Sequence, residues 1–453
     1  MKAKFFCAVI SLLILSGFGT AQSGVEPTPT PVKVVVTDSI QPIKNLPAQS
    51  TVEPTPTPVE VVITDSTPAR SATVAPRIAP SPSQTPLATR ERLAGPAVNS
   101  ESSTPAPTGS NLAARSLSFG QIKSKIAEAK RLLQSRPLAT ALVEGTAPTD
   151  YVRVAYQDSK NNRIDFFVLN KDAFLDINNE KFVSSENGRQ LRVRTIRGNG
   201  VNTPIVLLDD QNEQQLPLMV QYPVVRNGRY METAYDMSTH PGLITSEVVA
   251  AGRYYVRNVI EIARDRLREK GINISPRLAD IAERLATVEH VDHDRFRNEF
   301  HANIYNDIFT LYALNEGQTY RYSVSSAGAG GMVQMIPSTY RMVRSWHPNV
   351  PLIPDFVEGM RNHVNATEAM LLYMQRTWTD LIASPTVAGA HASGIATQEQ
   401  LMAAGYNSNP AKIAGYINRA GDNWTSLIPR ETKIYLQIYE SLEKYVPMTP
   451  RTK

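Results

Sequence analysis

The chain has 453 residues, of which 42% are hydrophobic and 20% are charged, and it contains 32 prolines and one cysteine. At about 100 to 200 residues per domain, this length predicts two or three folded units. The formal net charge of +5 is too small an excess to indicate a nucleic-acid partner. Because Cys7 is the one cysteine, disulfide frameworks and cysteine-bound zinc are excluded.

Residues 1–22 have the pattern of a secretory signal peptide. Lys2 and Lys4 precede an apolar run from Phe5 to Leu15, and small residues follow. This run is too short to span a bilayer stably, and no later stretch reaches about 18 uninterrupted apolar residues. We therefore expect an exported, soluble protein in the periplasm, the cell wall or the extracellular space.

Residues 23–112 are expected to be a disordered linker rich in proline and threonine, since 16 of the 32 prolines fall there. Residues 25–39 recur at residues 52–66 with two differences. Two copies are too few for a solenoid, and Pro-Thr alternation favours an extended spacer. The apolar tails Val34–Val36 and Val61–Ile63 leave open a second role, as strands added to an envelope protein partner.

Residues 113–245 are expected to form one amphipathic helix and a small, mostly antiparallel β-rich domain. Between Phe119 and Ser135, apolar residues recur at helical spacing, which predicts a helix that packs on the next domain. Five β-rich runs follow, separated by Asn-Gly turns: 151–156, 164–169, 191–196, 205–208 and 218–225. The ligand of this domain stays open, and an envelope protein is one candidate.

Residues 246–453 are expected to be a helical domain. One helical pattern starts at Ser246 and ends before Gly271, and Ser275-Pro276 opens the next helix as cap and first turn. Loops are expected around residues 323–331, 347–354 and 383–398.

One stretch of this domain carries the residues of a candidate acid. Ile304, Ile308 and Leu311 form an apolar helical face that leads to Glu316, and a glycine-rich segment from Ser325 to Gly331 follows. An apolar helix that delivers a carboxyl group into a glycine-walled cleft suits general acid catalysis. Desolvation raises the pKa of a carboxyl toward neutral pH, and the missing side chains admit a bulky substrate.

These residues resemble the soluble lytic transglycosylase family, which is related to goose-type lysozymes. Glu316 precedes Ser325 by nine residues, and the segment from Gly328 to Thr339 matches the family's glycine, glutamine and proline pattern. Two later segments resemble the family's remaining motifs: Ala404–Pro410 and Pro429–Tyr435. The resemblance implies a mainly α, lysozyme-like catalytic domain behind the β-rich domain, and peptidoglycan glycan strands as substrate.

The resemblance also implies a single-acid lyase reaction. Most glycosidases use two carboxylates, but no acidic residue follows Glu316 until Asp355. Glu316 would protonate the oxygen between N-acetylmuramic acid and N-acetylglucosamine, with help from the substrate's acetamido group. It would then take a proton from the 6-hydroxyl, which closes a 1,6-anhydro ring.

The resemblance assigns five further residues to the substrate and implies no cofactor or metal. Ser325 would hydrogen-bond near the acid, Gln334 and Asn407 would hold sugar amide or hydroxyl groups, and Tyr406 would flank the acid. Glu431 would lie deep in the cleft.

A second polar cluster, from Glu289 to His301, precedes this stretch. His290 and His293 could share a helix face as metal ligands, but their spacing fits no zinc-hydrolase pattern, so a polar helix end is the better account. Glu289 is the alternative acid because residues 285–288 also bring an apolar helix to a glutamate. Against it, 36 residues separate Glu289 from Ser325.

Two other functions stay open. Hydrolysis of the same bond follows if water reaches the intermediate before the 6-hydroxyl does. A non-catalytic peptidoglycan-binding scaffold is the other alternative, in which Gly317 and Ile336 mark a degraded cleft.

Overall fold

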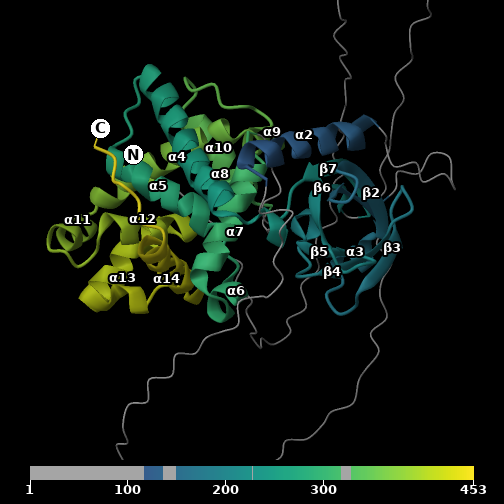
Figure 1. Ribbon diagram of the computed structural model, residues 1–453. Helices are drawn as coiled ribbons and strands as arrows, with labels where there is room; N and C mark the ends of the chain where they lie inside the picture. Colours follow the sequence, from purple (N-terminus) through teal and green to yellow (C-terminus); the bar gives the residue numbers. More distant parts are fainter. Residues whose placement is uncertain (1–116, 136–148, 227, 318–327, 453) are drawn as a thin grey trace, which may run out of the picture. The chain divides into compact units, whose positions relative to one another are not determined.

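The computed structural model describes residues 117–135, 149–226, 228–317 and 328–452. These residues form a mostly helical C-terminal part, preceded by one helix and a β-rich region (Figure 1). The expected signal peptide, linker and twofold repeat lie outside the described residues, as does Ser325. Within the described ranges, no helix is both long and apolar enough to cross a membrane.

Helix α2 spans Phe119–Ser135, the bounds that the apolar spacing predicts. Its buried face, with Ile122, Ala129 and Leu133 fully buried, packs against the β-rich region in one hydrophobic cluster. That cluster also includes Leu314 from the helical part. The expectation that this helix packs on the next domain is confirmed.

The β-rich region is one antiparallel sheet of seven strands, in the order β2-β1-β6-β5-β4-β3, with β7 paired to β6. A backbone hydrogen bond of 2.8 Å from Glu186, just after β3, to Phe166 in β2 links the two ends of this order, so the sheet is nearly closed. Two of the strands, β3 and β7, were not predicted. The elements are β1 (Tyr151–Asp158), β2 (Arg163–Asn170), α3 (Lys171–Leu175), β3 (Lys181–Ser184), β4 (Gln190–Thr195), β5 (Ile205–Asp209), β6 (Gln214–Arg226) and β7 (Arg229–Asp236).

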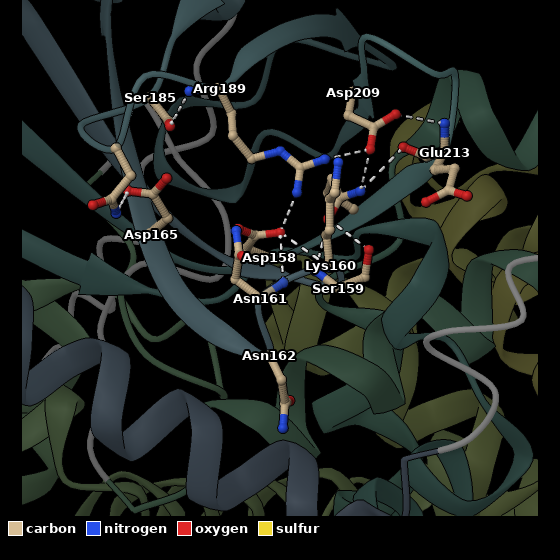
Figure 2. Close-up of polar contacts among 12 residues, drawn as sticks. Asp158, Ser159, Lys160, Asn161, Asn162, Asp165, Ser185, Arg189, Asp209 and Glu213 are labelled. Atoms are coloured by element: carbon tan, nitrogen blue, oxygen red, sulfur yellow. Dashed lines mark hydrogen bonds and ion pairs between the residues drawn. The ribbon is translucent and has the colours of Figure 1, made fainter.

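Two turns of this sheet are each organised by a buried aspartate (Figure 2). Asp158 starts the β1–β2 turn and accepts the Lys160 backbone N–H at 3.1 Å. Asp209 starts the β5–β6 turn and accepts the Glu213 backbone N–H at 2.8 Å. Such side-chain acceptors favour turns because they satisfy backbone donors that the strands leave unpaired.

Arg189 bridges the two aspartates across the sheet (Figure 2). Its guanidinium pairs with Asp158 and lies 2.6 Å from Asp209, and both carboxylates are buried. Burial opposes ionisation of Asp158, but the hydrogen bond from Asn161 and the charge of Arg189 outweigh it and hold its pKa below the usual range. The network thus satisfies two buried charges with one cation.

The helical part contains two helix boundaries that the sequence predicts. Helix α4 begins at Ser246 and ends two residues before Gly271, which has φ = 78°. The Ser275 side chain caps α5 by accepting the Leu278 N–H at 3.2 Å. The expected loop over residues 383–398 is wrong in part, because it contains helix α11. The helices are α4 (Ser246–Glu269), α5 (Pro276–Val288), α6 (His293–Asn298), α7 (His301–Leu314), α8 (Pro337–Trp346), α9 (Phe356–Arg361), α10 (His363–Ile382), α11 (Pro385–Ala392), α12 (Gln398–Asn407), α13 (Ile413–Ala420) and α14 (Arg430–Tyr445).

Polar contacts also join the β-rich region to the helical part. The Asn315 amide forms two hydrogen bonds with the Met237 backbone, at 2.9 and 3.2 Å. Arg361, the last residue of α9, pairs with Glu232 of β7 at 2.7 Å. Together with the shared hydrophobic cluster, these contacts hold the two regions in one structure.

Candidate active site

The C-terminal end of α5 places Glu289 in a half-buried setting. The helix is apolar along Leu285, Ala286 and Val288, and Glu289 is the residue directly after its last turn. The Tyr435 hydroxyl donates a hydrogen bond of 2.6 Å to Glu289 Oε1. Burial raises the pKa of Glu289 to about 8; the nearby charge of Glu431 adds to the shift and the Tyr435 hydrogen bond opposes it.

Glu289 lines a cavity of about 860 Å³ that both regions of the structure enclose. Much of the wall comes from the end of α5 and from α6 and α7. The segments that follow β4 and β7 complete it. The residues from the β-rich region are Arg197, Gly198, Asn199, Asn202 and Thr239. The predicted motifs contribute Ala329, Gln334, Ile336, Asn407, Glu431 and Tyr435.

The glycine segment forms a tight turn in the cavity wall. Gly331 has φ = 67°, and a Cβ there would lie 2.2 Å from the Met360 carbonyl oxygen, so only glycine fits. Gln334 also has a positive φ, 46°, and its Nε2 donates to the Gly331 carbonyl at 2.8 Å. Gln334 lines the cavity, and the expectation that it holds sugar amide or hydroxyl groups stays a prediction.

Three tyrosines surround Glu289 and join it to this turn. The Tyr406 hydroxyl donates to the Val333 carbonyl at 2.8 Å, and the Tyr312 hydroxyl donates to the carbonyls of Ala286 and Met332. Burial raises the pKa of Tyr312, Tyr406 and Tyr435 well above the usual range, and the charge of Glu289 contributes to each shift. Tyr406 therefore lies near a half-buried carboxyl group, that of Glu289, and not near Glu316.

The last two motifs meet at Asn407 and Glu431. The Thr432 hydroxyl donates to Asn407 Oδ1 at 2.9 Å, which fixes the orientation of the amide. The expectation that Glu431 lies deep in the cleft is wrong, because it occupies the first turn of α14 and is an exposed residue of the cavity wall.

The structure does not place Glu316 in this cavity. Helix α7 ends at Leu314, and Asn315 is held by the Met237 backbone. The Glu316 carboxylate is 31% exposed and pairs with Lys123 of α2 at 2.5 Å. The expected delivery of Glu316 into a desolvated, glycine-walled cleft is therefore wrong, because the chain turns toward α2 at the helix end.

Two histidines of the cluster from Glu289 to His301 have separate partners. His290 Nε2 lies 3.0 Å from the Met332 carbonyl oxygen, and burial lowers its pKa to about 4. His301 stacks on Phe296 and contacts the Ser441 hydroxyl at 2.7 Å. No group of three or more side chains suited to a metal ion occurs in the described parts of the chain.

The cavity wall contains an ion-pair cluster that the sequence does not predict. Arg197, which follows β4, and Arg295 in α6 both donate to Asp307 Oδ2, at 3.0 and 2.8 Å. Tyr435 lies in the segment Pro429–Tyr435, which resembles a family motif, but the sequence does not predict its contact with Glu289. No spacing or composition signal singles out Arg197, because its role depends on the tertiary contact with α7.

We found no protein-family model that matches the chain, and no curated protein or solved structure that is similar to it. The functional assignment therefore depends on the chemistry of this cavity.

Proposed function

We propose that the protein is an exported peptidoglycan lytic transglycosylase with Glu289 as its general acid and base. The observation that carries the proposal is a single cavity in which a carboxyl with a pKa of about 8 meets all three segments of the motif resemblance. Perturbed carboxyls in clefts are characteristic of catalytic acids. The motifs therefore support the single-acid lyase reaction that the resemblance implies, with Glu289 in place of Glu316 as the acid.

Protonated Glu289 is suited to the first step. With a pKa of about 8, the carboxyl keeps its proton at neutral pH. The Tyr435 hydroxyl occupies Oε1, so Oε2 is the oxygen that carries the proton. Glu289 protonates the glycosidic oxygen between N-acetylmuramic acid and N-acetylglucosamine, while the acetamido group of the substrate attacks the sugar carbon.

The second step uses the carboxylate that remains. It takes a proton from the 6-hydroxyl of the muramoyl residue, and that oxygen attacks the same sugar carbon, which breaks the bond to the acetamido oxygen, restores the acetamido group and closes the 1,6-anhydro ring. Three other carboxylates of the wall have structural partners: Asp307 pairs with two arginines, Asp292 caps α6, and Asp294 pairs with Arg297. A two-carboxylate hydrolysis would therefore need Glu431, the remaining carboxylate of the wall, as its second group.

The cavity size and its amide groups suit a glycan strand. At about 860 Å³ it lies near the upper end of the usual range for binding pockets. Gln334 and Asn407 present amide side chains in its wall, which are suited to hydrogen bonds with N-acetyl or hydroxyl groups.

Mass spectrometry of digested peptidoglycan tests the proposal. We expect the wild type to release 1,6-anhydromuramoyl products, and Glu289→Gln to lower their rate by about 100-fold or more. The matched control, Glu316→Gln, keeps the wild-type rate because Glu316 lies outside the cavity.

Each other result contradicts a defined part of the proposal. Reducing ends in place of anhydro ends would indicate hydrolysis. Full activity of Glu289→Gln with loss in Glu316→Gln would restore Glu316 as the acid. Binding of peptidoglycan by the wild type without any product would indicate the non-catalytic scaffold.

A further inference from the structure

The β-rich region contributes a cation to the cavity that holds Glu289. Arg197 lies between β4 and the short turn Gly200–Asn202, and it lines the cavity together with Gly198 and Asn199. A Cβ on Gly198 would lie 2.6 Å from the Leu175 carbonyl oxygen, so this position needs a glycine for the segment to pack closely on α3. The fold thus fixes Arg197 at the wall.

Only one nitrogen of the Arg197 guanidinium donates hydrogen bonds to other described residues. Its Nη2 donates to Thr239 Oγ1 at 2.9 Å and to Asp307 Oδ2 at 3.0 Å. Its Nε and Nη1 have no hydrogen-bond partner among the residues that the structure describes, and the side chain is 29% exposed. The three N–H donors on Nε and Nη1 of this cavity-lining residue thus make no hydrogen bond within the described residues.

Arg197 and Arg295 are the two arginines of a cavity wall that also carries five carboxyl groups, so an anion can bind only where a guanidinium donor is unused. Both arginines share the Asp307 carboxylate. Glu299 occupies the other donors of Arg295 through two hydrogen bonds of 2.8 and 2.7 Å. Arg197 has no second carboxylate of this kind bonded to its own donors within the described residues.

We propose that Arg197 is a specificity residue that binds a carboxylate carried by the N-acetylmuramic acid unit of the substrate. This inference rests on the proposed function. Guanidinium groups bind carboxylates through paired N–H donors, and the glycan backbone itself offers only hydroxyl and amide groups. The carboxylate belongs either to the stem peptide or, on a strand without peptides, to the lactyl group.

Three substrates separate these two sources. The first is intact peptidoglycan, whose stem peptides carry carboxylates and whose lactyl groups are amide-linked. The second is the glycan strand after an amidase has removed the peptides, which exposes lactyl carboxylates. The third is the same stripped strand after its lactyl carboxylates are converted to neutral N-methylamides.

We expect Arg197→Gln to lower kcat/KM by about 10- to 100-fold on one carboxylate-bearing substrate and to leave the rate on the neutral strand unchanged. A loss confined to intact peptidoglycan assigns the carboxylate to the stem peptide, and a loss confined to the stripped strand assigns it to the lactyl group. Arg197→Lys keeps the charge but not the paired donors, so it should recover only part of the loss.

Asp307→Asn is the matched control for a purely structural role, since it removes the ion pair and retains Arg197. Equal losses in Arg197→Gln and Asp307→Asn on all three substrates would overturn the inference, because Arg197 would then only join β4 to α7. Wild-type rates of Arg197→Gln on all three would also overturn it and leave the proposed function intact. A wild type without products on any substrate contradicts the proposed function itself.

Discussion

The Glu289 carboxyl holds its proton far above the pH at which the unfolded chain releases it. Its pKa is about 8 in the folded protein, against an ordinary value of 4.5. Between these two values the folded state binds more protons than the unfolded state, so the stability that this group contributes falls as pH rises. The fold therefore loses stability progressively from about pH 4.5, and the loss is complete once Glu289 ionises above about pH 8.

This linkage predicts a pH-dependent stability change in Glu289→Gln. Because glutamine has no proton to lose, the variant should gain at least about 1 kcal/mol relative to the wild type between pH 5 and pH 8.5, or about 2–4 °C in Tm. Thermal unfolding of both proteins at the two pH values measures the gain. Glu316→Gln should show no comparable change, because its carboxylate is partly exposed on the surface; a gain of the same size there would refute the linkage to Glu289.

The pH profile of activity should report the same carboxyl. The general acid must be protonated in the free enzyme, so we expect kcat/KM to fall above about pH 8. The Tyr435 hydrogen bond lowers the pKa of Glu289, so Tyr435→Phe should move this alkaline limb to higher pH. Steady-state rates from pH 5 to pH 10 measure the limb, and a shift to lower pH in Tyr435→Phe would contradict the assignment.

At the scale of elements, the turn at Gly331 supports the cavity wall. Gly331→Ala would place a methyl group against the Met360 carbonyl at a positive φ, so it should destabilise the fold by about 1–3 kcal/mol and lower activity. Gly389→Ala is the control: Gly389 lies within α11, and a Cβ there meets no atom within 4 Å. The control should be neutral or gain up to about 1 kcal/mol. Urea denaturation of both variants measures their free energies of unfolding. Equal losses in the two variants would show that the added methyl group destabilises the fold wherever it is placed, and not because of the backbone conformation at Gly331.

Several elements could be predicted because their signals are local. The spacing of Ile122 and Ala129 and the cap at Ser275 fix α2 and the start of α5 without reference to the rest of the chain. Strand β3 has only four residues, and β7 is mostly exposed or half-buried, so neither gives a clear alternating apolar pattern. Helix α11 was missed because its eight residues have no amphipathic pattern.

The acid that we propose differs from the one that the sequence spacing favours, for a reason that spacing cannot reveal. Helices α6 and α7 lie between Glu289 and the glycine turn, so the two parts of the site are distant in sequence and meet only after folding. Glu316 had the expected nine-residue spacing, but the chain turns toward α2 before reaching it. Gln334 and Asn407 both line the cavity, and each lies within a continuous motif; their contact with substrate stays a prediction.

At the scale of the whole molecule, α2 joins the β-rich region to the helices. Ile122 is fully buried in the cluster that contains Leu218 of β6 and Leu314 of α7. Ile122→Ala should therefore destabilise both regions by about 2–5 kcal/mol, as large-to-small substitutions in cores do. Lys130→Ala, on the exposed face of the same helix, should change stability by less than about 0.5 kcal/mol. Denaturation followed by circular dichroism and by tryptophan fluorescence tests the pair; loss of the sheet signal alone would show that α2 does not join the regions.

The link that Arg189 makes between two hairpin turns determines how the sheet comes together. Asp158 and Asp209 lie on opposite sides of Arg189 in the sequence, and either hairpin formed alone would bury a carboxylate with no counter-charge. Partly formed sheets are therefore penalised, and the two hairpins gain their full stability only when both are present. The β-rich region should fold and unfold in one cooperative step, so its end of the active-site cavity is either complete or absent.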